Sequence, residues 1–192
     1  MVSYEEMELA VAERLGETAA AHSRAVADAA GLLATIYGVD AEQARLAGLL
    51  HDWDRELPAD ELLTSAEGLG IEVTEADRAV PYLLHARTGA ERLRRDYPDI
   101  PEAVASAVAC HTVGSGEMTE LDLVVYIADM ISADRTFPGV ADLREAVGNI
   151  GLNELFALCY QHSMLHLIER RKRLHPDTLA VWNRLVARGV HG

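Results

Sequence analysis

A histidine and an aspartate directly follow a run of apolar residues in the stretch Ala47-Gly48-Leu49-Leu50-His51-Asp52. Upstream, Asp40 and Gln43 form a capping-box start, so the run belongs to a helix whose apolar side begins at Ala44. Burying an unpaired charge costs, as an order of magnitude, several kcal/mol. The helix that ends at His51 and Asp52 therefore indicates a helical core. Within that core, these two side chains must contact groups of opposite charge.

The spacing of apolar residues on either side of this stretch is also helical. In the second expected helix, the stripe Val26, Ala29, Leu33 and Ile36 predicts the buried face, and His22 shares it. No alternating strand pattern of useful length occurs, so we expect one all-α domain over residues 1–192. Its core would span about 18–135, with C-terminal helices at about 141–188 packed on it. The expected helices run over about Tyr4–Leu15, Thr18–Tyr37, Asp40–Asp52, Pro58–Gly68, Thr74–His85, Pro101–His111, Leu121–Ile131, Leu152–Lys172 and Pro176–Arg188.

Composition narrows the classes of function. The chain is 49% hydrophobic and only 5% aromatic, which favours helices over sheets. A net charge of −14 argues against nucleic-acid and anionic-membrane surfaces, because both need a basic field. Residues 1–13 lack an apolar signal core, and no apolar run approaches the roughly 20 residues of a membrane span. Cys110 and Cys159 form no metal-binding or disulfide pattern, so we expect a cytoplasmic protein.

Four other ionisable residues follow or share apolar helical runs: His22, His85, His111 and Asp129. Taken singly, each has an ordinary explanation, because a lone histidine is more often a hydrogen-bonded core residue and a lone aspartate a helix cap. Together with His51 and Asp52 they make four histidines and two aspartates on five separate expected helices. Few basic residues lie in those runs, so bound metal is the simplest source of opposite charge.

The types of ligand narrow the choice of metal. Imidazole and carboxylate without thiolate suit iron, manganese, cobalt or zinc better than magnesium or calcium. Six ligands are too many for one catalytic ion that keeps an open position, and they suit two ions that share a carboxylate. Such a pair can hold a bridging hydroxide and clamp the oxygens of a phosphoryl group. The sequence therefore predicts a two-metal centre.

The sequence resembles the HD superfamily of metal-dependent phosphohydrolases over about Ala21 to Leu185. Within that superfamily it is similar to the bacterial symmetrical dinucleoside tetraphosphate hydrolases. The stretches that carry the resemblance are Leu49-Leu50-His51-Asp52-Trp53-Asp54-Arg55-Glu56-Leu57-Pro58, Leu83-Leu84-His85, Gly89-Ala90, His111-Thr112-Val113-Gly114, Ile127-Ala128-Asp129, Arg135-Thr136-Phe137-Pro138-Gly139-Val140 and His175-Pro176.

This resemblance implies an HD-type helical bundle with a binuclear centre, commonly of iron. It also implies that the chain splits diadenosine tetraphosphate in the middle into two ADP, through a hydroxide that bridges the metals. By position, His22, His51, Asp52 and Asp129 would bind the first ion, and Asp52 would bridge to the second, held by His85 and His111. A homodimer is expected only from the general frequency of dimers among soluble enzymes.

Three departures from the family pattern concern the substrate rather than the metals. Arg55 stands where the family usually has lysine, and arginine could bind a phosphate oxygen bidentately. Met130, Ser132 and Ala133 replace the usual tyrosine, glutamate and proline. Asp54 is expected to place a negative charge beside the pocket entrance.

Five residues are candidates for substrate binding: Arg55, Thr112, Gly114, Arg135 and Phe137. We expect Arg55 and Arg135, with Asp52, to take part in catalysis by balancing charge on the transferred group. Arg135 could instead pair with Asp134 or Asp142 in solvent. Gly114 could simply end a helix, and Phe137 could pack rather than stack on a base.

Three alternative functions stay open at this point. The first is another HD phosphohydrolase that acts on mononucleotides or phosphomonoesters. The second is a nucleotide-binding regulatory protein without turnover. The third is a structural metalloprotein whose ions hold the helices together, in which case chelation would unfold it.

Overall fold

The computed structural model describes residues 2–187 and 189, and in this part of the chain all regular structure is helical. The all-α prediction is confirmed. The elements are α1 Tyr4–Arg14, α2 Glu17–Tyr37, α3 Ala41–Leu50, α4 Ala59–Gly68, α5 Glu75–Ala79, the 3-10 turn η1 Pro81–Leu83, α6 Leu84–Asp96, α7 Glu102–Cys110, α8 Glu120–Ile131, α9 Val140–Ala146, α10 Leu152–Glu169 and α11 Pro176–Ala187.

The helix starts follow from their capping residues. Thr74 and Asp77 form a reciprocal capping box at α5, and Thr119 and Asp122 form another at α8. The carboxylate of Asp40 accepts hydrogen bonds from two backbone N–H groups in the first turn of α3. The sequence predicts a capping box at Asp40; the structure forms its N-cap half, and the Gln43 side chain instead donates to the Asp40 carboxylate at 2.9 Å.

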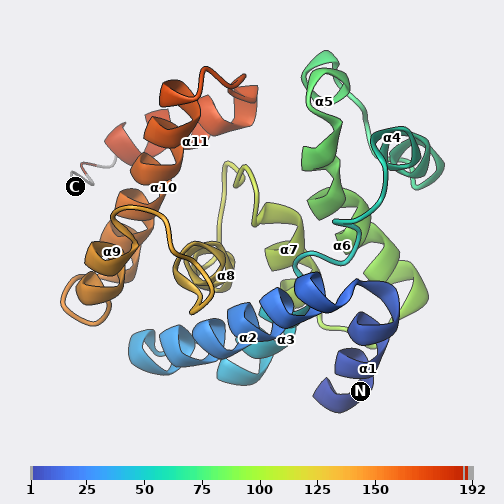
Figure 1. Cartoon of the computed structure of the whole chain (residues 1–192), viewed down its shortest axis with the longest axis horizontal. Helices are drawn as coiled ribbons and strands as arrows, with labels where there is room; N and C mark the ends of the chain where they lie inside the picture. The colour runs from blue at the N-terminus through green and yellow to red at the C-terminus, as the bar shows by residue number, and fades with distance from the viewer. Residues whose placement is uncertain (1, 188, 190–192) are drawn as a thin grey trace.

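The centre of the fold is the layer made by α2, α3, α7 and α8 (Figure 1). Fully buried Val26, Leu50, Val108 and Ile127 supply one side chain from each of these helices. α2 and α3 approach closely at Gly48, where an added Cβ atom would lie 2.9–3.0 Å from the backbone of α2. Close contact between backbones there fixes how α3 presents the residues that follow it.

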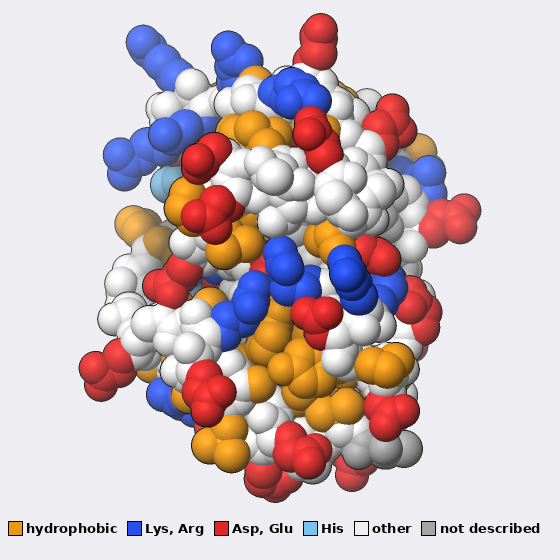
Figure 2. All heavy atoms as spheres, turned by 90° about the vertical axis from the view of Figure 1, so that its right-hand side faces the viewer, with side chains coloured by type: hydrophobic (Ala, Val, Ile, Leu, Met, Phe, Trp, Pro, Cys, Tyr) orange, Lys and Arg blue, Asp and Glu red, His pale blue; other side chains and the backbone are white. Residues whose placement is uncertain are grey.

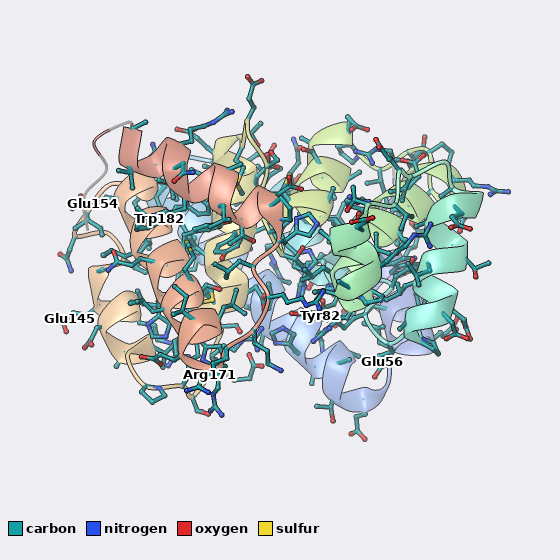
Figure 3. All side chains as sticks on the ribbon, turned by 90° about the horizontal axis from the view of Figure 1, so that it is seen from above. Glu56, Tyr82, Glu145, Glu154, Arg171 and Trp182 are labelled. Atoms are coloured by element: carbon teal, nitrogen blue, oxygen red, sulfur yellow. The ribbon has the colours of Figure 1, made fainter. Side chains whose placement is uncertain are left out.

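The remaining helices lie on two sides of this layer. In Figure 1, α4, α5 and α6 lie on one side and α9, α10 and α11 on the other. α4 packs against α6 through a small apolar cluster that includes Leu62 and Leu84. Tyr82, labelled in Figure 3, lies between the two groups of helices. The main apolar cluster runs from Met7 to Leu185 and includes residues of the C-terminal helices.

The structure corrects three expectations about the helices. Ile36 is 43% exposed rather than buried, because nine residues after Ala27 it lies about 180° around the helix from that buried position. His85 does not end a helix but lies in the first turn of α6, after the 3-10 turn that Pro81 starts. α9 and most of α6 were not expected. The predicted last residue of the final helix, Arg188, lies outside the described residues.

Within the described residues, the model has no helix that is both long and apolar enough to span a bilayer. On the face shown in Figure 2, acidic side chains are interspersed with arginines around apolar areas. This mixed surface is in keeping with the excess of acidic residues in the sequence.

Candidate metal centre

The candidate ligands come from five helices that meet at the central layer. His51 and His111 are the C-cap residues of α3 and α7, and His85 lies in the first turn of α6. Asp129 lies in the last turns of α8, and His22 lies inside α2. With Asp52, which follows His51, the structure brings together all six residues that the sequence singles out.

Three of the histidines are oriented by the backbone. Their Nδ1 atoms face the carbonyl oxygen three residues earlier, at 2.8 Å for His51, 2.5 Å for His85 and 2.7 Å for His111. The last carbonyls of a helix have no partner within the helix, so a C-cap histidine can donate to one of them. These hydrogen bonds place the proton on Nδ1 and turn the lone pair of Nε2 toward the cluster.

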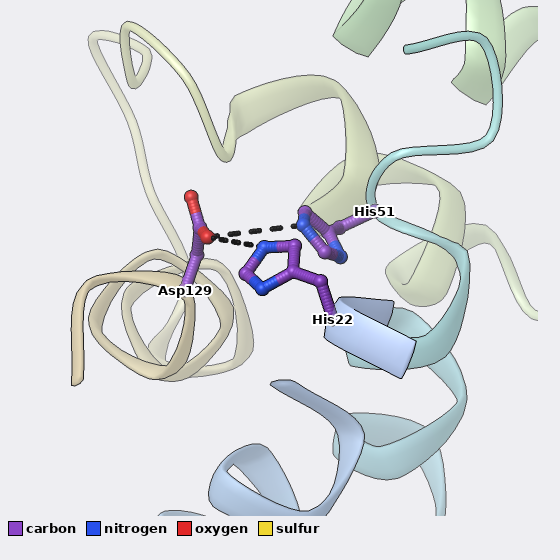
Figure 4. A group of neighbouring side chains, drawn as sticks. All are labelled: His22, His51 and Asp129. Carbon is purple, nitrogen blue, oxygen red and sulfur yellow. Dashed lines mark hydrogen bonds and ion pairs between the residues drawn. The ribbon is translucent and has the colours of Figure 1, made fainter. Parts of the chain in front are cut away.

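His22 is oriented by a side chain. Its Nδ1 lies 2.8 Å from a carboxylate oxygen of Asp134, and its Nε2 lies 3.0 Å from Oδ1 of Asp129. Nε2 of His51 lies 3.8 Å from the same Asp129 oxygen. Figure 4 shows the two rings converging on that carboxylate from α2 and from the turn after α3. One carboxylate oxygen therefore faces imidazole nitrogens from two elements.

Asp52 makes the corresponding contacts on the other side of the cluster. Its Oδ1 lies 3.1 Å from Nε2 of His85 and 3.5 Å from Nε2 of His111, and its Oδ2 lies 3.3 Å from Nε2 of His51. The two Nε2 atoms of His85 and His111 are themselves 3.1 Å apart. Asp52 is thus the residue that connects both halves of the cluster.

The electrostatics of the cluster follow from burial and mutual charge. Burial by itself lowers the pKa of His51, but the carboxylates of Asp52 and Asp129 outweigh it and raise the pKa to about 9. Burial lowers the pKa of His111. Burial acts to raise the pKa of both aspartates, yet the neighbouring histidines, and for Asp129 also Arg135, hold each well below its ordinary value. Both carboxylates are therefore ionised at neutral pH.

These residues fit metal ions. Nε2 of His51 is buried and has no hydrogen-bond partner among the described residues, and such an atom is costly to leave unpaired. Two groups could each surround a cation, with ligand atoms within 4.8 Å of one another: His22, His51 and Asp129, and His51, Asp52 and His111. Imidazole nitrogens that face ionised carboxylates need either a proton or a cation between them, and imidazole with carboxylate suits a transition metal.

Four residues of the cluster, Asp52, His85, His111 and Asp129, line an open cavity of about 190 Å³. Arg55, Thr112 and Arg135 line the same cavity, as the sequence predicts for substrate-binding residues. Nε of Arg55 lies 3.9 Å from Oδ1 of Asp52, and its guanidinium lies over the ring of Tyr82. Arg135 pairs with the Asp129 carboxylate and donates from Nε to the Asp129 carbonyl at 2.8 Å. The partner of Arg135 is therefore neither Asp134 nor Asp142.

Two other predicted substrate residues lie elsewhere. The ring of Phe137 packs 4.8 Å from that of His162, and Gly114, at φ 77°, approaches Met118 and Val181. Neither belongs to the residues that line the cavity of about 190 Å³. Positive φ alone accounts for a glycine at position 114, because other residues are strained there.

Asp54 corrects another expectation. Its side chain is fully buried rather than beside the pocket entrance. It accepts hydrogen bonds from Arg14 at 2.5 Å and from Arg92 at 3.2 Å. Arg14 also donates to the Trp53 carbonyl at 2.6 Å, so these contacts attach α1 to the turn after α3. Trp53 is buried.

Sequence reasoning missed residues whose role depends on tertiary contact. Tyr82, Tyr126 and Ser163 line the cavity from η1, α8 and α10. Asp134 orients His22, although 112 residues separate the two. Asp134 carries no sequence signal of its own, since it reads as a polar residue in a turn.

Comparison with known proteins agrees with this geometry. The family model described as the HD domain matches residues 19–134. A Bacillus subtilis protein named "Bis(5'-nucleosyl)-tetraphosphatase, symmetrical" is 30% identical, with 95% of this chain and 97% of that protein covered. A Staphylococcus aureus protein of the same name is 30% identical over 89% of this chain and 88% of that protein.

A solved structure of an HD superfamily protein has the same fold. It is a Clostridium acetobutylicum protein described as a "predicted HD superfamily hydrolase involved in NAD metabolism". It superposes with a TM-score of 0.90 at 34% identity and covers 98% of this chain and 99% of its own. The chain described here belongs to the HD domain family.

Proposed function

We propose that this chain is a metal-dependent hydrolase that cleaves dinucleoside tetraphosphates symmetrically, with diadenosine tetraphosphate giving two ADP. The observation that carries the proposal is a cluster of four histidines and two aspartates, four of which line an open cavity together with Arg55 and Arg135. The four in the wall are Asp52, His85, His111 and Asp129, and behind them His22 and His51 contact the two carboxylates. The similarity to proteins named as symmetrical tetraphosphatases supports the choice of substrate.

The proposed cofactor is a pair of transition-metal ions, with iron first and manganese, cobalt or zinc as alternatives. His22, His51 and Asp129 would hold one ion, and His85 and His111 the other, with Asp52 between them. Bound there, such ions would polarise a water molecule and neutralise phosphate oxygens. The buried, backbone-oriented imidazoles contribute rigidity, because ligands that are already in place need no rearrangement during the reaction.

The arginines act on the phosphate chain. Arg55 and Arg135 approach the cavity from opposite elements, the turn after α3 and the loop after α8. Each guanidinium can donate two parallel hydrogen bonds to a phosphate group and balance negative charge as the phosphoanhydride breaks. Thr112 adds a hydroxyl to the same wall.

A second cavity of about 110 Å³ continues from the first and shares Tyr82, Leu83, Thr112, Tyr126 and Ser163 with it. Beyond these shared residues its apolar and aromatic part is Val113, Tyr160, Met164 and Leu167, and its polar part is Arg173, His175 and Thr178. Aromatic and apolar walls suit a base and ribose, which supports a substrate with a nucleoside attached to its phosphates.

The test combines metal analysis with product analysis on one purified sample. We expect about two equivalents of a transition metal and ADP as the sole nucleotide product of diadenosine tetraphosphate. In water enriched in oxygen-18, one of the two ADP molecules should carry the label, because water supplies the new oxygen. AMP with ATP as products would overturn symmetrical cleavage, and release of phosphate from mononucleotides alone would favour the other HD phosphohydrolases.

A matched pair of variants tests the proposed substrate contact. Arg55→Gln should raise KM for the tetraphosphate at least about 10-fold, since a charge-assisted hydrogen bond contributes about 1.5–3 kcal/mol. Arg78→Gln is the control, because Arg78 pairs with Glu67 on the surface. Equal KM values for the two variants would refute the role of Arg55.

A further inference from the structure

His22 differs from the other candidate ligands in how its ring is fixed. His51 and His111 cap helix ends, where free carbonyl oxygens accept hydrogen bonds from their Nδ1–H groups. His22 lies in the second turn of α2, and the carbonyls around it are used by the hydrogen bonds of the helix itself. A histidine inside a helix needs a side chain from elsewhere to choose its tautomer.

Asp134 supplies that side chain. One carboxylate oxygen lies 2.8 Å from Nδ1 of His22, and the other accepts a hydrogen bond from the buried hydroxyl of Ser132 at 2.7 Å. The Ser132 contact fixes the carboxylate, so that both of its oxygens have a partner. With its proton held on Nδ1, His22 turns the lone pair of Nε2 toward Asp129.

The loop that carries Asp134 is itself held by one arginine. Arg144 of α9 donates to the carbonyls of Ile131, Ser132 and Arg135, at 2.9, 2.5 and 2.9 Å. These carbonyls lie at the end of α8 and in the loop after it, where the helix offers no partners. The guanidinium thus fixes the backbone on both sides of Asp134.

We propose that Asp134 is a positioning residue for His22, and that Arg144 holds the loop so that this carboxylate stays in register with the ring. A carboxylate that accepts a hydrogen bond from Nδ1–H makes Nε2 a stronger metal ligand, and such outer partners change metal affinity about 10- to 100-fold. The inference rests on the proposed metal centre but not on the proposed substrate.

The first experiment titrates protein stripped by chelation with Mn²⁺, for wild type, Asp134→Ala and Asp142→Ala. Asp142 is exposed in the first turn of α9 and serves as the control. We expect Asp134→Ala to bind one equivalent about 10- to 100-fold more weakly, while the other equivalent changes less, because only His22 loses its partner. Equal affinities of the Asp134→Ala and Asp142→Ala proteins for both equivalents would overturn the proposal.

The second experiment reads the tautomer directly. Nitrogen-15 NMR of the histidine rings should place the proton of His22 on Nδ1 in wild type and lose that preference in Asp134→Ala. Arg144→Lys keeps the charge but loses the planar guanidinium that donates to three carbonyls. It should therefore weaken the binding of the same equivalent of Mn²⁺. An unchanged His22 tautomer in Asp134→Ala rejects the inference. If the protein binds two equivalents of metal but produces no ADP, only the proposed reaction is rejected. The Mn²⁺ affinities and the His22 tautomer still decide whether Asp134 positions His22.

Discussion

Replacement of Asp52 by asparagine is the most informative perturbation, because one carboxylate contacts three imidazoles. Its oxygens lie 3.1–3.5 Å from the Nε2 atoms of His51, His85 and His111. The asparagine side chain would keep the shape but lose the charge that both proposed ions share. We expect Asp52→Asn to retain less than one metal equivalent and to lose hydrolysis, while the helices persist.

The same substitution should change the stability of protein stripped of metal. The pKa of His51 is raised from about 6.5 to about 9, chiefly by Asp52 once burial has been overcome. At about 1.4 kcal/mol per unit, the net shift corresponds to about 3 kcal/mol of stability, to which Asp129 and the Gly48 carbonyl also contribute. Removal of one partner from a buried ion pair lowers the free energy of unfolding by a similar amount.

The sign of this effect sets a pH window. The raised pKa of His51 means that its contribution is complete below about pH 6.5 and is lost as the pH rises toward 9. The lowered pKa of Asp52 means that its contribution is present above about pH 4 and is lost at lower pH. The stability gap between wild type and Asp52→Asn should therefore be widest near pH 5–6.5 and shrink toward pH 9.

Urea unfolding across this pH range, with metal content and product analysis on the same preparations, checks all three expectations. The control is Asp60→Asn, an exposed residue in the first turn of α4. Two bound ions and full activity in Asp52→Asn would refute the shared-carboxylate assignment. A gap that does not depend on pH would refute the electrostatic account of His51.

Two further substitutions test the scaffold rather than the chemistry. Gly48→Ala should destabilise the protein by about 1–3 kcal/mol in urea unfolding, because the new Cβ would lie 2.9–3.0 Å from the backbone of α2. Unchanged stability would show that α2 and α3 can move apart without cost. Asp54→Ala should cost about 3 kcal/mol by leaving Arg14 and Arg92 without their shared partner, and hydrogen exchange should rise first in α1; uniform exchange across the chain would contradict the attachment of α1 through Asp54.

The residues that were predictable from the sequence share one property: each is a polar residue that differs sharply from its neighbours along the chain. His51 and His111 stand out because they end apolar runs, and the apolar runs in turn locate the central helices. Asp40 marks the start of α3 because its carboxylate caps N–H groups only two and three residues further on. Signals of this kind need only the neighbours along the chain.

What the sequence could not provide is the partner of each charge. Asp54 reads as an exposed acidic residue, yet Arg14 and Arg92 lie 40 and 38 residues away and neutralise it. Ile36 was misplaced for a different reason. A spacing of three or four residues fits two neighbouring faces of a helix, and only packing against α3 decides which one is buried.

A chain with a net charge of −14 repels a polyphosphate, so binding requires positive charge concentrated within the cavity. Within the cavity, Arg135 pairs with Asp129 and Arg55 lies near Asp52, so the two guanidinium groups face carboxylates as well as open space. Cations bound between those carboxylates would compete with the arginines for the same oxygens. They would thereby add positive charge and also free both guanidinium groups to bind phosphate.

This coupling predicts that nucleotide binding, and not only turnover, depends on metal. A pair of unit charges 4 Å apart contributes about 4 kcal/mol at an effective dielectric constant of about 20. Even half of that changes affinity by more than about 10-fold. ADP should therefore bind at least about 10-fold more weakly after chelation, as measured by calorimetry, and recover when Mn²⁺ is restored. Equal affinity before and after chelation would mean that Arg55 and Arg135 reach the phosphates without help, and that the ions act only on the reacting water.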